Sequence, residues 1–329
     1  MNASVVVPTS GDGYGRRLDN CLRSIRAQSV QPERLFLGCL ERRGELGSVR
    51  RLTEQAIEHE ATIVFAQHDS TLWPPSLARN ICFRHVQSEV VATVDADAVL
   101  HPRTLEMALE RLASDGKAVV RVQTKLMPYK SDHAMFRNLS PASFEKNAQQ
   151  GAVARGPGCC IVARTRDIES IHGWDEAYVG HGVADWDFVC RLKMQGLHLI
   201  SLSAVDGVWS MHQDHERAID RSAVQRNLAL FSSIDKKASP LRNMESWGGM
   251  PSSFGQPGSV GRPEQVICAN DLSQEQLLLQ LSRERVQSPP KDGADLVVVL
   301  DANQPCDASH CRVATLCREN GVPLRVVRK

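Results

Sequence analysis

The stretch VVATVDADAVLHP occupies residues 90–102 and decides the fold class. Its apolar first part predicts a strand over residues 89–94. Two carboxylates, Asp95 and Asp97, follow that strand directly. In open α/β sheets, ligands gather outside the carboxyl ends of the strands. The stretch therefore puts two acids where a ligand of such a sheet would bind.

On both sides of this stretch, short apolar strands alternate with amphipathic helices. The expected strands cover residues 4–7, 34–40, 62–66, 118–123 and 158–163, and the expected helices cover 17–28, 47–58, 76–86, 102–114 and 185–195. Such alternation is typical of a layered α/β fold. We therefore expect a mostly parallel, Rossmann-like sheet with helices on both faces.

The composition changes after the first two thirds of the chain. Residues 236–263 are rich in Ser, Gly and Pro and read as a linker or a loop draped over the main domain. This predicts a catalytic domain at 1–235 and a small C-terminal α/β extension of unknown role at 264–329. The extension is expected to hold helices near 272–285 and 307–320 and strands at 295–300 and 322–328.

Charge and hydropathy exclude some partners. Lys and Arg total 39 against 38 for Asp and Glu, so the near-neutral chain has no overall positive charge that would attract nucleic acid. The longest apolar runs, such as residues 296–300, fall far short of the roughly 20 residues that a transmembrane helix needs. No leader-like segment follows Met1. We expect a cytoplasmic enzyme, leave open whether it attaches peripherally to a membrane, and make no prediction of its oligomeric state.

Several segments together resemble the family 2 glycosyltransferases. ARN at residues 78–80, the strand, DAD at 95–97 and Pro102 follow one another as they do in that family. VVVPT at 5–9 and CLRSI at 21–25 look like its first strand and helix. The resemblance covers about residues 3–231. It implies a GT-A fold and an inverting hexosyl- or hexosaminyltransferase that uses a nucleotide-sugar donor, in the first instance a UDP-sugar, and a glycan or lipid-linked acceptor.

The reaction that this resemblance implies calls for a divalent cation, Mn²⁺ or Mg²⁺, because the leaving diphosphate is doubly charged. Asp97 is the expected carboxylate ligand. MHQDH at 211–215 lies where related enzymes bring a histidine to the metal, which makes His212 the first candidate and His215 the second. The donor-binding residues implied by the resemblance are Pro8, Thr9, Glu41, Arg79 and Asp95. Arg79 could equally pair with an acid near the sheet.

A second group of motifs resembles the acceptor side of the same family. It consists of GPG at 156–158, GWDE at 173–176 and DWDF at 185–188, followed by Arg191 and Leu192. The resemblance gives Asp185 the role of catalytic base, because the acceptor hydroxyl must lose its proton as it attacks. The alternative reading of Asp185 is a helix N-cap or first-turn acid. Trp174, Trp186 and Asp187 are the acceptor-binding candidates, with core packing the alternative for the tryptophans and support of a nearby Arg the alternative for Asp187.

Two departures from the family pattern keep other functions open. The second strand ends with Glu41 alone where the family carries an acidic pair, and Ala184 stands where a glutamate precedes the base. A retaining GT-A transferase and a degenerate sugar-binding or nucleotide-binding scaffold are the alternatives. GDGYGRR at 11–17 gives a faint copy of a nucleotidyltransferase signature.

Overall fold

The computed structural model describes residues 1–11, 13–42, 48–127, 144, 152–154, 156–157, 159–215, 220–233, 239–243 and 247–248, and the backbone of strands at 265–268, 296–300 and 324–328. Its strands are β1 Ala3–Thr9, β2 Arg34–Arg42, β3 Thr62–His68, β4 Val90–Val94, β5 Ala98–Leu100, β6 Ala118–Val122, β7 Thr124–Leu126, β8 Ala152–Val153, β9 Cys160–Arg164, β10 His198–Leu202, β11 Ser210–His212, β12 Gln265–Cys268, β13 Leu296–Leu300 and β14 Leu324–Arg328. The helices are α1 Arg16–Arg26, α2 Arg50–Glu58, α3 Pro75–Phe83, α4 Thr104–Ser114, α6 Thr165–Glu169, α7 Ala184–Met194 and α8 Arg221–Ser233, with a 3₁₀ turn, η2, at Ala204–Asp206.

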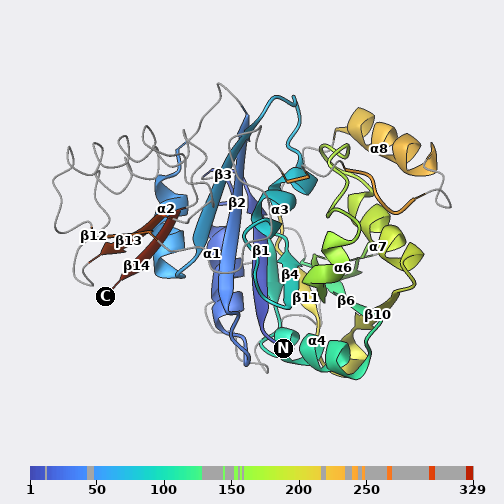
Figure 1. Ribbon diagram of the computed structural model, residues 1–329, viewed down its shortest axis with the longest axis horizontal. Coiled ribbons are helices and arrows are strands. Elements are labelled where there is room, and N and C mark those ends of the chain that lie inside the picture. The colour runs from blue at the N-terminus through green and yellow to red at the C-terminus, as the bar shows by residue number, and fades with distance from the viewer. Residues whose placement is uncertain are drawn as a thin grey trace.

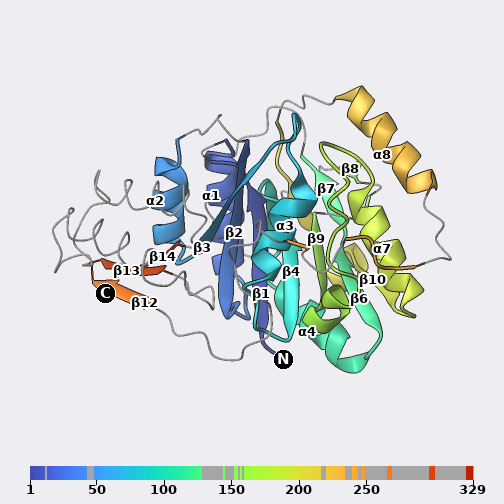
Figure 2. The ribbon, with the colours of Figure 1, turned by 45° about the horizontal axis from the view of Figure 1, so that its top comes forward.

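One large sheet forms the centre of the molecule, in the strand order β10-β6-β9-β4-β1-β2-β3-β14-β13-β12. β4, β1, β2 and β3 pair in parallel, whereas β9 runs antiparallel between β4 and β6. Helices cover both faces of this sheet (Figures 1 and 2). The α/β class with a mostly parallel sheet is therefore confirmed.

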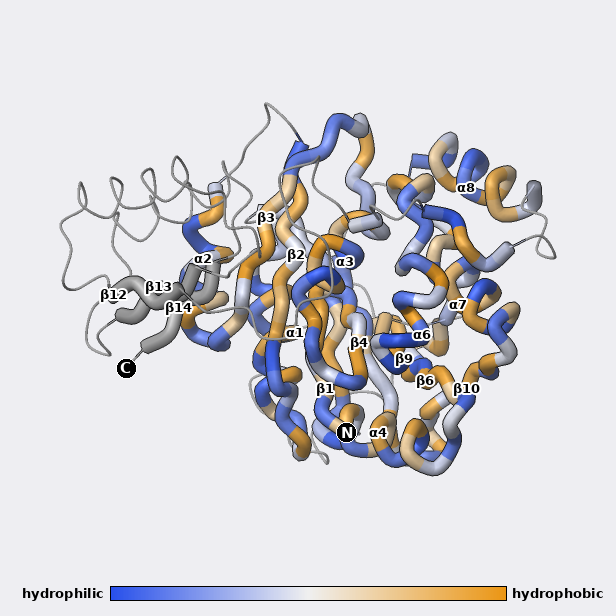
Figure 3. Tube along the Cα trace, in the orientation of Figure 1, coloured by the Kyte–Doolittle hydropathy of each residue, from blue (hydrophilic) through white to orange (hydrophobic). Residues whose placement is uncertain are grey.

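The central strands β1, β2, β3 and β4 are buried on both faces of the sheet, which separates two hydrophobic cores. Val5 and Val7 of β1 join the core under α1, α2 and α4, whereas Val6 joins the core under α3, α6 and α7. This division follows from the two-residue repeat of a strand, and strands covered on both faces read as continuous apolar runs. Figure 3 shows such hydrophobic runs along the central strands.

A smaller sheet of four strands, in the order β5-β11-β7-β8, adjoins the end of β4. β11 runs antiparallel to β5, and His212 pairs there with Ala98. None of these strands is longer than three residues. This sheet brings residues near position 212 beside the acidic turn after β4.

The expected elements of residues 1–200 that fall on described residues are confirmed within a few residues at their ends, although α3 stops at Phe83 rather than at residue 86. Sequence analysis missed the short strands of the second sheet, and it also missed α6, α8 and β12. Strands at 296–300 and 324–328 bear out the two expected in the tail, whereas the two tail helices lie outside the described residues.

The C-terminal strands continue the large sheet rather than forming one of their own. β14 pairs antiparallel with β3, where Leu324 lies opposite Ile63. β13 and β12 follow in parallel. The boundary expected at residues 236–263 stays a prediction. Among the described helices, none combines the length and the apolar character needed to cross a membrane.

Candidate active site

A tight turn after β4 presents the two acids of the DAD stretch. The amide of Asp95 still donates to Cys159 O at 2.9 Å, which extends the pairing of β4 with β9 by one residue. The amide of Ala98 then donates back to Asp95 O at 2.9 Å and starts β5. The turn thus fixes both ends of the segment, and it places Asp95 and Asp97 at the carboxyl end of a central parallel strand.

Arg79 of α3 links this turn to the base candidate. Its Nη2 lies 2.8 Å from Asp95 Oδ1 and 3.6 Å from Asp185 Oδ1. The guanidinium is buried, so these ion pairs are screened little by solvent. Of the two readings of Arg79, the structure shows the pairing with acids near the sheet. A contact with a donor diphosphate stays a prediction.

The crowding of carboxylates changes how Asp95 titrates. Burial and the charges of Asp185 and Asp97 raise the pKa of Asp95 to about 7, against the lowering influence of Arg79. A nearby cation favours the ionised form of a carboxylate.

Asp97 meets two histidines from the end of β11. Its Oδ2 lies 3.0 Å from His215 Nε2 and 3.4 Å from His212 Nε2. One ligand atom from each of the three residues lies within 4.8 Å of the others, close enough to share a metal ion. Burial opposes ionisation of Asp97, but the hydrogen bond with His215 and the charges of both histidines outweigh it and lower the pKa of this carboxyl.

Gln213 fixes the loop between the two histidines, and sequence analysis did not single it out. Its amide donates to Asp97 O at 2.9 Å, and its side chain donates to Arg17 O at 2.9 Å. Gln213 Oε1 accepts from Asn20 Nδ2 of α1 at 2.7 Å. All three contacts hold His212 and His215 against the acidic turn. The available signal was Asn20 beside the apolar residues Leu18, Cys21, Leu22 and Ile25 of the same helix.

Asp185 lies in the first turn of α7, whose N-cap is Val183. The N-cap reading of Asp185 is therefore wrong, whereas the first-turn reading holds. Its Oδ1 accepts a hydrogen bond from Trp174 Nε1 at 3.1 Å and faces Arg79. The carboxylate is thus held between a guanidinium and an indole at the same edge of the sheet as Asp95.

The predicted role of Trp174 in acceptor binding requires a correction. Trp174 is only 1% exposed, and its ring stacks between Phe83 and Phe188, with ring centroids 5.4 Å and 3.4 Å away. Because both faces are covered, Trp174 offers no surface on which an acceptor sugar could stack. Core packing is the correct reading of this residue. Trp186, at 37% exposed, stays a candidate for acceptor contact.

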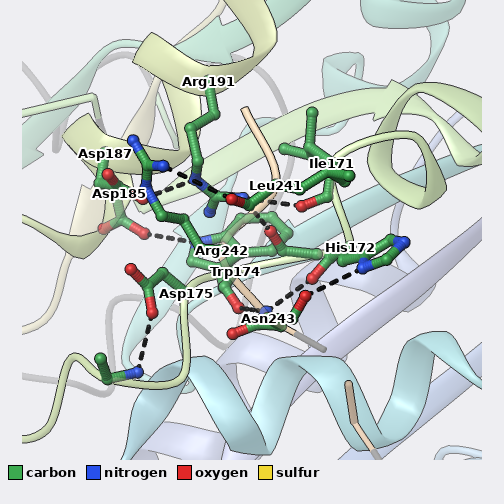
Figure 4. A network of polar contacts seen from close by, with 12 residues as sticks. Ile171, His172, Trp174, Asp175, Asp185, Asp187, Arg191, Leu241, Arg242 and Asn243 are labelled. Carbon is green, nitrogen blue, oxygen red and sulfur yellow. Dashed lines mark hydrogen bonds and ion pairs between the residues drawn. The ribbon is translucent and has the colours of Figure 1, made fainter. Parts of the chain in front are cut away.

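The predicted role of Asp187 in acceptor binding also requires a correction, because this side chain is buried in an ion pair. Its Oδ2 lies 2.7 Å from Arg191 Nε, and both side chains are almost fully buried. Arg191 Nη1 donates in turn to Ile171 O at 3.0 Å and to Gly173 O at 2.8 Å (Figure 4). Asp187 therefore supports the arginine that holds the GWDE turn, and it is not exposed to an acceptor.

The remaining donor candidates lie at the ends of the neighbouring strands. Pro8 and Thr9 close β1, and both are buried. The hydroxyl of Thr9 is buried without a hydrogen-bond partner among the described residues. Glu41, near the end of β2, is also buried and lies against Gly11. Their contact with a donor stays a prediction.

Tyr14, in the segment before α1, was not among the candidates. Burial and the charges of Asp97 and Asp95 raise the pKa of its phenol. Its ring lies 6.4 Å from that of Trp73, and the guanidinium carbon of Arg17 lies 5.6 Å from its centroid. The glycine-rich segment after β1 thus contributes an aromatic ring close to the acids.

Comparisons with known proteins agree with this architecture. The sequence profile described as "Glycosyltransferase like family 2" matches residues 2–227. Fold and profile together define a glycosyltransferase with the GT-A fold. The chain belongs to the family 2-like glycosyltransferases.

Among solved structures, the chain is similar to S. aureus TarS at 16% identity, with 65% of this chain and 37% of TarS covered and a TM-score of 0.46. A structure of TarS 1–349 with UDP-GlcNAc matches at 16% identity over 66% of this chain and 60% of that one, with a TM-score of 0.43. A third, with UDP, matches at 14% identity over 72% and 74%, with a TM-score of 0.46. The chain thus spans under two thirds of the first two. No curated protein matches it in sequence.

Proposed function

We propose that this glycosyltransferase moves a sugar from a nucleotide-diphosphate donor to an acceptor hydroxyl with inversion, using a divalent cation and Asp185 as the base. One observation carries the proposal. Asp97 with its two histidines, and Asp95 with Arg79 and Asp185, form adjoining groups at the carboxyl edge of one sheet. A site for a charged diphosphate and a base for the acceptor are the two parts that such a transfer needs.

The residues present fit a metal ion. Asp97, His212 and His215 offer one carboxylate oxygen and two imidazole nitrogens. Mg²⁺ prefers oxygen ligands, whereas imidazole suits the first-row transition metals, so this donor set favours Mn²⁺ over Mg²⁺. When bound, the cation neutralises the charge that develops on the leaving diphosphate.

The other steps fall to side chains of the chain itself. Asp185 takes the proton of the attacking hydroxyl, and its position is fixed by Trp174 Nε1 at 3.1 Å. Arg79 keeps Asp185 and Asp95 at a fixed separation through its two ion pairs. A base of this kind contributes roughly 10²–10⁴-fold to a rate when it lies within hydrogen-bond reach of the proton.

The proposed donor and acceptor classes rest on the family resemblance and on the residues near Asp185. A UDP-sugar follows from the family resemblance, and a glycan or lipid-linked hydroxyl is the acceptor class. Trp186 is the exposed aromatic residue beside Asp185 that offers a face to a sugar ring. Ala184 leaves this side without the usual glutamate, so the acceptor is held by other groups than in most of the family.

The experiment is a donor panel with a stereochemical readout. Purified protein is incubated with Mn²⁺ and UDP-GlcNAc, UDP-glucose, UDP-galactose or GDP-mannose, with a chelator as the control, and nucleotide release is followed. Turnover of one donor that stops with chelator, and a product of inverted anomeric configuration by NMR, is the expected result. A retained configuration would support the retaining alternative. Absence of binding and turnover with every donor would support the scaffold.

A further inference from the structure

A segment beyond the family match returns to the site. The profile ends at residue 227, whereas residues 239–243 and 247–248, which we name the strap, contact the GWDE turn at 173–176. Figure 4 shows Asn243 of the strap beside Trp174. That turn carries Trp174, the hydrogen-bond partner of Asp185. The contacts between the strap and the turn can therefore affect the position of Asp185, the proposed base.

Asn243 makes the central contacts of the strap. Its Nδ2 donates to Trp174 O at 2.5 Å and to His172 O at 2.6 Å. Its Oδ1 accepts from the amide of Glu176 at 3.0 Å. One side-chain amide thus satisfies two backbone groups of the turn and one of His172, the residue before it, and this ties the backbone at Trp174 to the strap.

The second piece of the strap closes on the same turn. The amide of Gly248 donates to Glu176 Oε1 at 2.6 Å. Gly248 has a φ of 61°, and a Cβ there would come within 2.5 Å of Asn80 O, so this close approach needs glycine. The buried ring of Trp247 stacks on His172, with the centroids 6.3 Å apart.

The turn needs such support because its backbone is strained. His172 has a φ of 55° and Gly173 a φ of 69°. The left-handed region is unfavourable for a residue with a side chain, and it persists only where the surroundings enforce it. His172 Nδ1 lies 3.0 Å from Asn243 O, and its ring lies on Trp247. Both of these contacts of the His172 side chain come from the strap.

We propose that the strap positions Asp185 through the GWDE turn, so that Asn243 and Trp247 are positioning residues of the transferase. The proposal rests on the proposed role of Asp185 as base. The path runs from Asn243 to the backbone of Trp174, and from the Trp174 indole to Asp185 Oδ1. Misplacement of a reacting group by about 1 Å costs about 10²-fold in rate, so loosening the turn slows transfer without touching the donor site.

A purely stabilising strap is the competing explanation, and Gln28 provides a matched control. Its Nε2 donates to Ser24 O and to His101 O, both at 2.9 Å, and its Oε1 accepts from the amide of Leu105 at 2.9 Å. Gln28→Ala therefore removes the same three kinds of bond as Asn243→Ala, but it does so between α1 and α4.

The first test observes the Trp174 indole directly and needs no substrate. The chain has 5 tryptophans, so the indole N–H signals of the ¹⁵N-labelled protein are few, and Trp174→Phe assigns the one of interest. In Asn243→Ala, this signal is expected to move toward its position in Asp185→Ala and to exchange with solvent at least about tenfold faster. It should not move in Gln28→Ala. An unmoved signal in Asn243→Ala overturns the proposal.

The second test measures release of UDP from UDP-GlcNAc with water as the acceptor, below the unfolding temperature of every variant. We expect kcat of Asn243→Ala to fall by about tenfold or more with donor KM within about twofold, because only the base is displaced. Trp247→Ala should behave alike, and Trp247→Phe should restore kcat. Should Asn243→Ala not fold, Trp247→Ala takes its place in both tests.

The outcomes separate this proposal from the proposed function. If Asp185→Asn abolishes UDP release but Asn243→Ala loses no more than Gln28→Ala, the base stands and the positioning role is overturned. If Asp185→Asn turns over like the wild type, the base assignment fails and the positioning role falls with it. If the wild type releases no UDP, the indole signal alone decides.

Discussion

His215 Nε2 lies 3.0 Å from Asp97 Oδ2, although the two residues are 118 positions apart in the chain. The contact depends on β11 pairing with β5, which brings the loop after His212 beside the acidic turn. His212 Nε2 lies 3.4 Å from the same oxygen. Three side chains that could hold a metal ion thus converge from two distant segments at the carboxyl edge of the sheet.

If these residues hold a cation, His215→Ala and His212→Ala should each weaken Mn²⁺ binding by at least about tenfold, a loss that even second-shell changes at metal sites cause. Isothermal titration calorimetry with MnCl₂ measures it. His198→Ala is the matched control, since His198 lies 2.7 Å from Asp115 in an exposed pair. Equal affinity in all three variants would argue against the metal assignment.

Arg79 should be needed for activity as well as stability. Arg79→Ala leaves Asp95 and Asp185 without the cation between them. Removing one partner of a buried ion pair costs about 3–5 kcal/mol, which is here an upper range because Asp95 is partly exposed. Arg79→Lys keeps the charge but lacks the fork geometry, so we expect an intermediate effect on kcat and on the melting temperature.

Arg103→Ala is the control for this prediction. Its partner Glu106 lies 2.9 Å away in an exposed pair, where solvent screens the interaction and the loss of stability should be much smaller than in Arg79→Ala. The role given to Arg79 would be untenable if Arg79→Ala and Arg103→Ala had the same melting temperature and the same kcat.

Asp187 should matter for folding rather than for acceptor binding. Asp187→Ala leaves Arg191 buried and unpaired, which should lower the free energy of unfolding by about 3–5 kcal/mol in urea denaturation. Glu54→Ala, which removes an exposed pair with Arg50 at the same spacing on α2, should cost no more than about 0.5 kcal/mol. A stable Asp187→Ala protein with a raised acceptor KM would restore the acceptor-binding role that the structure removes.

Stability should fall in mild acid because of His59. Burial lowers the pKa of His59, although its hydrogen bond with Asp19 and the charge of Glu58 act in the opposite direction. The unfolded chain then binds more protons than the folded one, so stability is lost as the pH falls below about 6.5. The pKa of Asp19 is lowered, so Asp19 stays ionised in this range.

We therefore expect the melting temperature of the wild type to drop between about pH 8 and about pH 5, and the drop to be smaller in His59→Gln. Differential scanning calorimetry at both pH values measures the difference. His198→Gln replaces an exposed histidine and serves as the control. An identical drop in wild type and His59→Gln would contradict the account.

The sequence predicted those parts of the fold and site that depend on local pattern. Strand β4 and the turn with Asp95 and Asp97 follow from an apolar run and the residues after it. The placement of Asp185 in the first turn of a helix follows in the same way. Strands of three residues, such as β5 and β11, carry too little periodicity to be found.

Other features depend on contacts between distant segments. The burial of Trp174 depends on Phe83 and Phe188 covering its two faces. The contact of Gln213 with Asn20 joins residues 193 positions apart. Asn243 lies in a stretch whose composition predicted a linker or a loop draped over the main domain, but polar composition does not reveal the three hydrogen bonds of its side chain.

The most direct test of the central claim compares wild type with Asp185→Asn at equal Mn²⁺, using the donor that the panel identifies. Asparagine keeps the shape of aspartate and an oxygen that accepts the hydrogen bond from the Trp174 indole. It cannot act as a general base that takes the proton of the attacking hydroxyl. We predict unchanged donor affinity by calorimetry and a fall in kcat of at least about 10²-fold. Wild-type kcat in Asp185→Asn would contradict the account.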